Sequence, residues 1–83
     1  RMDQMRAWLR RAAAELGLDP DVVLEHEGAL LGLGAAVAHG PSRPGAPLTA
    51  FLVGLPAGAA DDKDAAIERA LAVVASLADS TDV

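Results

Sequence analysis

The chain has 83 residues and a net charge of −5, contains no cysteine and is 52% hydrophobic. The lack of cysteine excludes the disulfide scaffolds of small secreted domains and zinc sites built on thiolates. The acidic balance argues against nucleic-acid binding, because duplex binding needs many lysines and arginines on one face. We therefore expect one intracellular, cytoplasmic domain over residues 1–83, without a nucleic-acid partner.

The first predicted element is an amphipathic helix over residues 3–16. Its apolar side chains recur at helical spacing: Met5, Trp8, Leu9, Ala12 and Leu16. We expect Gly17 to end the helix in a left-handed conformation, and Trp8 to be the largest core side chain. If Trp8 is buried, truncating it should cost about 3–5 kcal/mol.

The same helix carries a cluster of arginines. Residues 1–16 hold four arginines and two acids, a balance of +2, whereas residues 17–83 hold three basic and ten acidic groups, a balance of −7. The arginines either form a solvated face with internal ion pairs or dock an acidic partner surface.

The next segment begins at Asp19-Pro20, a capping acid followed by a proline suited to the first helical position. A short helix from Pro20 and a second helical run over residues 29–38 follow, and the pattern leaves open whether they are continuous. Gly32 and Gly34 should weaken the second run, so we expect a neighbour packed closely against its backbone.

The central joint spans Val37–Leu55. One helix ends there at His39-Gly40-Pro41, and another begins between Pro44 and Pro47. The second helix has one apolar stripe, made of Leu48, Phe51, Leu52 and Leu55. Pro56 should stop or kink this helix, which leaves residues 56–60 as a linker of small residues. The prolines and Arg43 interrupt the apolar run, so no membrane span or membrane partner is expected.

Asp61 or Asp62 should cap the last helix, whose apolar stripe consists of Ile67, Ala70, Leu71, Val74 and Leu77. The tail over residues 79–83 should fray. No strand pattern occurs in the sequence. These features predict an all-α fold, a compact bundle of four or five short helices.

Arg43 and His39 are the candidate binding residues of the joint. A cation that precedes a helix N-terminus needs a negative neighbour. For Arg43 this is either an internal carboxylate, from Glu25, Glu27 or residues 61–64, or a bound phosphate. His39 either caps its own helix or helps Arg43 to bind an anionic ligand.

Other polar side chains of the sequence give weaker signals. Thr49 is the third candidate ligand group, although its hydroxyl is equally suited to bonding local backbone. His26 lies between two glutamates without further metal ligands, so we expect it to be solvated and predict no metal or cofactor. Ser42 lacks a histidine base in triad order, which argues against nucleophilic catalysis and leaves enzymatic activity unsupported.

The sequence resembles a small actinobacterial domain family of unknown function. The resemblance rests on four matching segments: Trp8-Leu9, Leu16-Gly17-Leu18-Asp19, Ala38-His39-Gly40 and Arg43 through Gly54. Members of that family occur alone or joined to the molybdenum-cofactor guanylyltransferase, and are often labelled molybdopterin-guanine dinucleotide biosynthesis proteins.

The resemblance implies an accessory role in molybdenum-cofactor maturation. The protein would be a non-enzymatic module that docks on the guanylyltransferase, or on a cofactor-receiving enzyme, through Val37–Leu55. Two alternatives stay open: a small domain that binds a nucleotide or pterin phosphate with Arg43 and His39, and a self-associating structural domain that forms a homo-oligomer.

Overall fold

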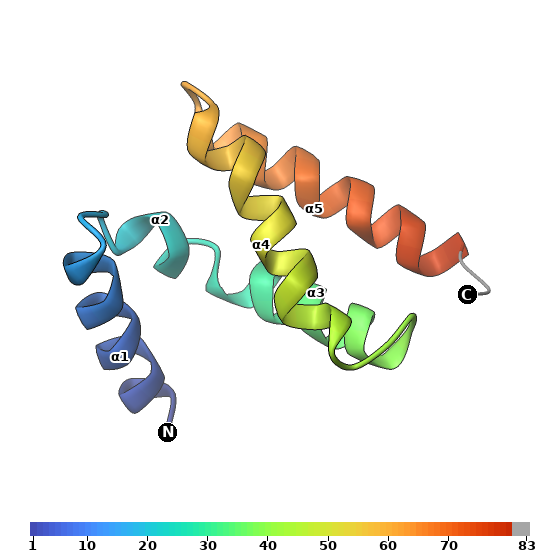
Figure 1. Cartoon of the computed structure of the whole chain (residues 1–83), viewed down its shortest axis with the longest axis horizontal. Helices are drawn as coiled ribbons and strands as arrows, with labels where there is room; N and C mark the ends of the chain where they lie inside the picture. The colour runs from blue at the N-terminus through green and yellow to red at the C-terminus, as the bar shows by residue number, and fades with distance from the viewer. Residues whose placement is uncertain (81–83) are drawn as a thin grey trace.

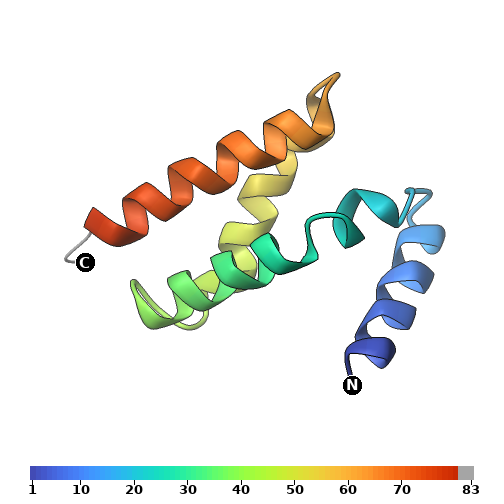
Figure 2. The same cartoon turned by 180° about the vertical axis from the view of Figure 1, so that it is seen from behind.

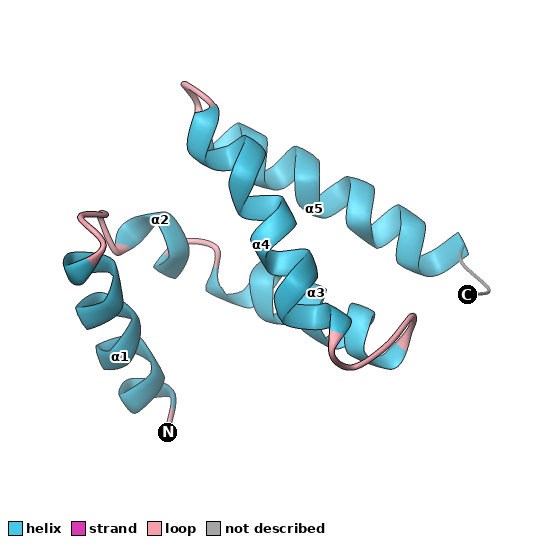
Figure 3. Ribbon diagram, in the orientation of Figure 1, coloured by secondary structure: helices cyan, strands magenta, loops and turns pink. Residues whose placement is uncertain are grey.

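A computed structural model describes residues 1–80, and within that range it consists of helices without any strand (Figures 1 and 3). The helices are α1 (Met2–Glu15), α2 (Asp21–Leu24), α3 (Glu27–His39), α4 (Gly45–Ala59) and α5 (Lys63–Ser80). The predicted all-α class is therefore confirmed. The turn at Glu25-His26 separates α2 from α3, so the region that begins at Pro20 forms two helices rather than one continuous helix.

The end of α1 forms as its glycine predicts. Gly17 has a φ of +73°, which a residue with a β-carbon rarely adopts. The Leu18 N–H donates to the Ala13 carbonyl at 2.8 Å, and the Gly17 N–H donates to the Ala14 carbonyl at 3.1 Å. This pair of bonds is the Schellman motif, and it turns the chain sharply towards α2.

Two aspartates cap the helices that follow them. Asp19 Oδ1 accepts a hydrogen bond of 2.9 Å from the Asp21 N–H at the start of α2. Asp62 Oδ1 accepts one of 3.0 Å from the Ala65 N–H at the start of α5. Each bond satisfies an N–H group that has no partner inside the helix, as the sequence led us to expect.

The core lies where α3, α4 and α5 pack on one another, while α1 stands apart and is joined to them through α2 (Figures 1 and 2). The buried side chains of this three-helix unit are Leu33, Val37, Val53, Ala57, Ala66 and Ile67. Most of them are small, and α1 adds only Ala13. The domain is flat, with extents of 39 × 32 × 17 Å.

The apolar stripe predicted on α4 does not face this core. Leu48, Phe51, Leu52 and Leu55 are all more than half exposed, whereas Val53 and Ala57 on the opposite side of the helix are buried. The α4 helix is apolar on every side, so its periodicity does not identify the side that packs. We call the four exposed side chains the α4 outer face.

Trp8 is also outside the core, in contrast to the prediction. Its side chain is 64% exposed, because α1 packs beside α2 rather than against the three-helix unit. The predicted stripe of α5 is only partly buried, since Ile67 is 6% exposed and Leu77 is 62% exposed.

The prolines and glycines of the central helices correct two further predictions. Pro56 lies inside α4, which continues to Ala59, so residues 56–60 are not a linker. Pro56 and Leu52 are both exposed, and water can therefore reach the Leu52 carbonyl that has lost its helical donor. No neighbour packs closely on Gly32 or Gly34, because a β-carbon at either position would meet nothing within 4 Å.

The expected fraying of residues 79–83 stays a prediction. Helix α5 includes residues 79 and 80, which were expected to fray, and residues 81–83 lie outside the described part of the chain. Over residues 1–80, no helix has the length and the apolar character needed to cross a membrane.

Candidate functional site

The α3–α4 corner carries the binding residues proposed from the sequence. His39 is the last residue of α3 and Arg43 precedes α4, so the corner brings both side chains to one exposed end of the helix pair. Thr49 lies further along α4 and is half-buried. Neither His39 nor Arg43 forms a side-chain hydrogen bond or an ion pair with residues 1–80.

The carboxylate partner expected for Arg43 is thus not found in the described part of the chain, and His39 does not cap its helix. Two of the acids considered for Arg43 have other partners. Glu27 pairs with Arg6, and Asp64 pairs with His26.

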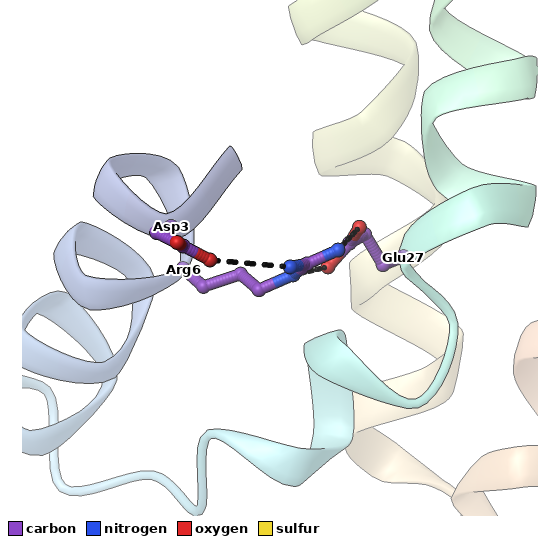
Figure 4. A network of polar contacts seen from close by, with 3 residues as sticks. All are labelled: Asp3, Arg6 and Glu27. Carbon is purple, nitrogen blue, oxygen red and sulfur yellow. Dashed lines mark hydrogen bonds and ion pairs between the residues drawn. The ribbon is translucent and has the colours of Figure 1, made fainter. Parts of the chain in front are cut away.

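The Arg6–Glu27 pair fixes α1 relative to α3 (Figure 4). Arg6 Nε lies 2.8 Å from Glu27 Oε1, and Arg6 Nη2 lies 2.9 Å from Glu27 Oε2. Asp3 Oδ1 adds a longer contact of 3.7 Å to Arg6 Nη1. This two-pronged geometry is the strongest that arginine makes with a carboxylate. Hydrogen bonding from Arg6 holds the pKa of Glu27 below its ordinary value, and the same bond raises the pKa of Arg6.

His26 connects the α2–α3 turn to the first turn of α5. Its Nε2 lies 2.8 Å from Asp64 Oδ1, and only 11% of its side chain is exposed. The expectation that His26 is solvated was therefore wrong. The two residues are 38 positions apart, so no local spacing in the sequence indicates this contact.

The start of α4 lacks the donors that bind phosphate at other helix N-termini. Pro44 and Pro47 have no N–H group. The Gly45 N–H donates to the Ser42 carbonyl at 3.1 Å, and the Ala46 N–H donates to the Arg43 carbonyl at 3.2 Å. An anion at this corner would rely on side chains alone, without the backbone cradle that phosphate sites use.

Two apolar cavities occur elsewhere, each of about 220 Å³. The first lies between α3 and α5, and is lined by Ala29, Gly32, Leu33, Ala36, Leu71, Val74 and Ala75. The second lies among α1, α2 and α3, and is lined by Met5, Leu9, Val23, Glu27, Leu30 and Leu31. Glu27 is the one polar residue that lines either cavity, and it is already paired with Arg6. Neither cavity has the converging polar groups that orient a small ligand.

One face of α1 combines an exposed tryptophan with a cation that has no partner in the described part of the chain. Trp8 is 64% exposed, and Arg11 follows it by one turn of the helix. Arg10 and Arg11 are exposed and form no ion pair with residues 1–80. We call Trp8 and Arg11 the α1 surface; Arg10, two residues after Trp8, lies on the other side of the helix. Tryptophan and arginine are the residues most enriched where protein interfaces gain their affinity.

Comparison with known proteins places the chain in a family without assigning it an activity. Among residues 1–80, no group of three or more histidines and acids is arranged to hold a metal ion. No curated protein and no solved structure matches the chain. The model of the family described as a domain of unknown function (DUF6457) matches residues 1–83, and the chain belongs to that family.

Proposed function

We propose that the protein is a non-enzymatic docking module that binds an acidic surface of a partner protein through the α1 surface. The observation that carries this proposal is the 64% exposure of Trp8, the one tryptophan of the sequence. The resemblance of the sequence suggests the partner, the molybdenum-cofactor guanylyltransferase, and hence a role in molybdopterin-guanine dinucleotide biosynthesis.

The charges of α1 support an acidic partner. Arg6 is paired with Glu27, but Arg11 on the Trp8 face has no carboxylate partner within residues 1–80. A partner that buries Trp8 would gain apolar contact area, and one of its acids would pair with the Arg11 guanidinium group.

The Arg6–Glu27 bond supports binding in a different way. It holds α1 in one orientation relative to α3, so that less conformational freedom is lost when a partner binds. The α1 surface would then be presented before the encounter rather than formed during it.

The test is a binding titration between the purified domain and the guanylyltransferase from the same genome. Trp8→Ala should weaken binding by at least about 30-fold, as is typical of a central interface aromatic. Val73→Ala is the matched control, because Val73 is a similarly exposed apolar residue on α5, at 59%. Arg11→Glu should weaken binding most at low salt. Unchanged affinity for Trp8→Ala would refute docking through α1.

Calorimetric titration with GTP, GMP and molybdopterin-guanine dinucleotide tests the ligand-binding alternative. The docking proposal expects no heat of binding with any of the three. Binding that Arg43→Ala and His39→Ala abolish would instead favour an anion site at the α3–α4 corner.

A further inference from the structure

The α4 outer face remains uncovered although it is apolar. Its four side chains are between 54% and 68% exposed. They lie on the side of α4 opposite the buried Val53 and Ala57. A helix that is apolar on all sides is normally surrounded by protein, yet α3 and α5 cover only one side of α4.

The accessible surface of the whole chain is also too large for a compact monomer. The surface is 5903 Å², whereas a folded monomer of 8.4 kDa has about 4,600 Å² by the usual scaling with mass. The excess is about 1,300 Å². A stable interface buries about 800 Å² on each partner. The excess belongs to the whole chain, in which α1 also stands apart, and it is large enough to include the area that one subunit buries in a stable dimer.

The distribution of charge favours a second copy as the occupant. No charged residue lies between Arg43 and Asp61, so two α4 outer faces can meet without like charges opposing each other. Contacts through α2, α3 or α5 would bring together surfaces from residues 17–83, which carry a net charge of −7. In a two-fold interface each patch meets its own copy, and an uncharged patch is the one suited to that.

Opposite charges at the two ends of α4 would attract each other across this contact. Arg43 precedes the helix, while Asp61 and Asp62 follow it, and Phe51 and Leu52 lie midway between these charges. An antiparallel pairing centred on Phe51 and Leu52 brings Arg43 of each copy to the acidic end of the other. This supplies the negative neighbour that Arg43 lacks within residues 1–80 of its own chain.

We propose that the protein forms a two-fold dimer in which the α4 outer faces pack antiparallel, with Arg43 of each chain near Asp61 of the other. The dimer does not involve the α1 surface, so the dimer and the docking on the transferase can be refuted independently of each other.

Sedimentation of the full chain over a concentration series tests the dimer. The wild type should approach twice its 8.4 kDa mass. Leu52→Glu should weaken dimerisation by about 100-fold, because it places two buried acids near the symmetry axis. Circular dichroism shows whether this variant keeps its helices, as the 63% exposure of Leu52 predicts. Val73→Glu, on α5, should leave the dimer intact.

A charge exchange tests the antiparallel register. Arg43→Asp and Asp61→Arg should each weaken the dimer several-fold, and the double variant should recover it. A monomeric wild type at all concentrations would overturn the proposal, as would dimers of Leu52→Glu as tight as the wild type. Charge variants without recovery would overturn the register.

Discussion

Trp8→Ala distinguishes an exposed interface residue from a core residue by the size of its effect on stability. Truncating a buried tryptophan costs about 3–5 kcal/mol. About a third of Trp8 is covered in this structure, so the expected loss in the free energy of unfolding is about 1–2 kcal/mol. For a domain of this size, that corresponds to a fall of roughly 5–15 °C in the melting temperature.

Thermal unfolding followed by circular dichroism measures this loss, and Ile67→Ala is the control. Ile67 is 6% exposed and contributes to the core, so its truncation should cost about 2–5 kcal/mol. Since Trp8 is the single tryptophan, its emission should be that of a solvated indole and change little on unfolding. A loss of 3 kcal/mol or more for Trp8→Ala, with a strong red shift on unfolding, would refute the placement of α1.

Three further predictions concern local features of the fold. Gly17→Ala should destabilise the fold by about 1–2 kcal/mol because Gly17 has a left-handed φ. Gly32→Ala should stabilise α3 by about 0.5–1 kcal/mol, because a β-carbon there meets nothing and alanine favours the helix. Urea unfolding measures both changes, and equal effects of the two substitutions would contradict the argument. Asp62→Ala should lower the free energy of unfolding by about 1 kcal/mol in the same assay, through loss of the α5 cap, and no loss would show that the cap is dispensable. Arg6 lowers the pKa of Glu27 in the folded state, so the ion pair stabilises the fold above the unfolded-state pKa of Glu27, and this stabilisation is lost as pH falls through the folded-state pKa. Glu27→Gln should therefore be less stable than the wild type at neutral pH and approach wild-type stability in acid. A stability difference between the two proteins that does not change with pH would contradict this prediction.

Features encoded by local chemistry were predictable from the sequence. Gly17 ends α1, and Asp19 and Asp62 start the helices that follow, because each depends only on residues within one turn. The all-α class follows equally from helical spacing and the absence of strand patterns. Such signals do not depend on how the helices pack.

The choice of buried face was not predictable, because α4 offers apolar side chains on every side. Its larger residues, such as Phe51, form the predicted core stripe, but Val53 and Ala57 are the buried ones, and their small side chains allow α3 and α5 to approach more closely. The helix end predicted at Pro56 does not occur, and the sequence does not reveal that Leu52, whose carbonyl the proline leaves unpaired, lies on the exposed side of α4.

The candidate site also combines features that local sequence predicts with features that depend on packing. The sequence identified His39 and Arg43 as side chains of one corner, and the structure places them there. It did not identify the Arg6–Glu27 and His26–Asp64 pairs, whose members are 21 and 38 residues apart. Such pairs depend on the folded path of the chain.

The scarcity of deeply buried side chains has a consequence for unfolding. No side chain among residues 1–79 is less than 2% exposed, and the interior consists largely of alanine and valine. The denaturant slope and the heat-capacity increment both scale with the area that unfolding exposes. Both quantities should be small for an isolated chain, so its unfolding transition should be broad. A molecule that binds over the outer helices should sharpen the unfolding transition and also raise its midpoint.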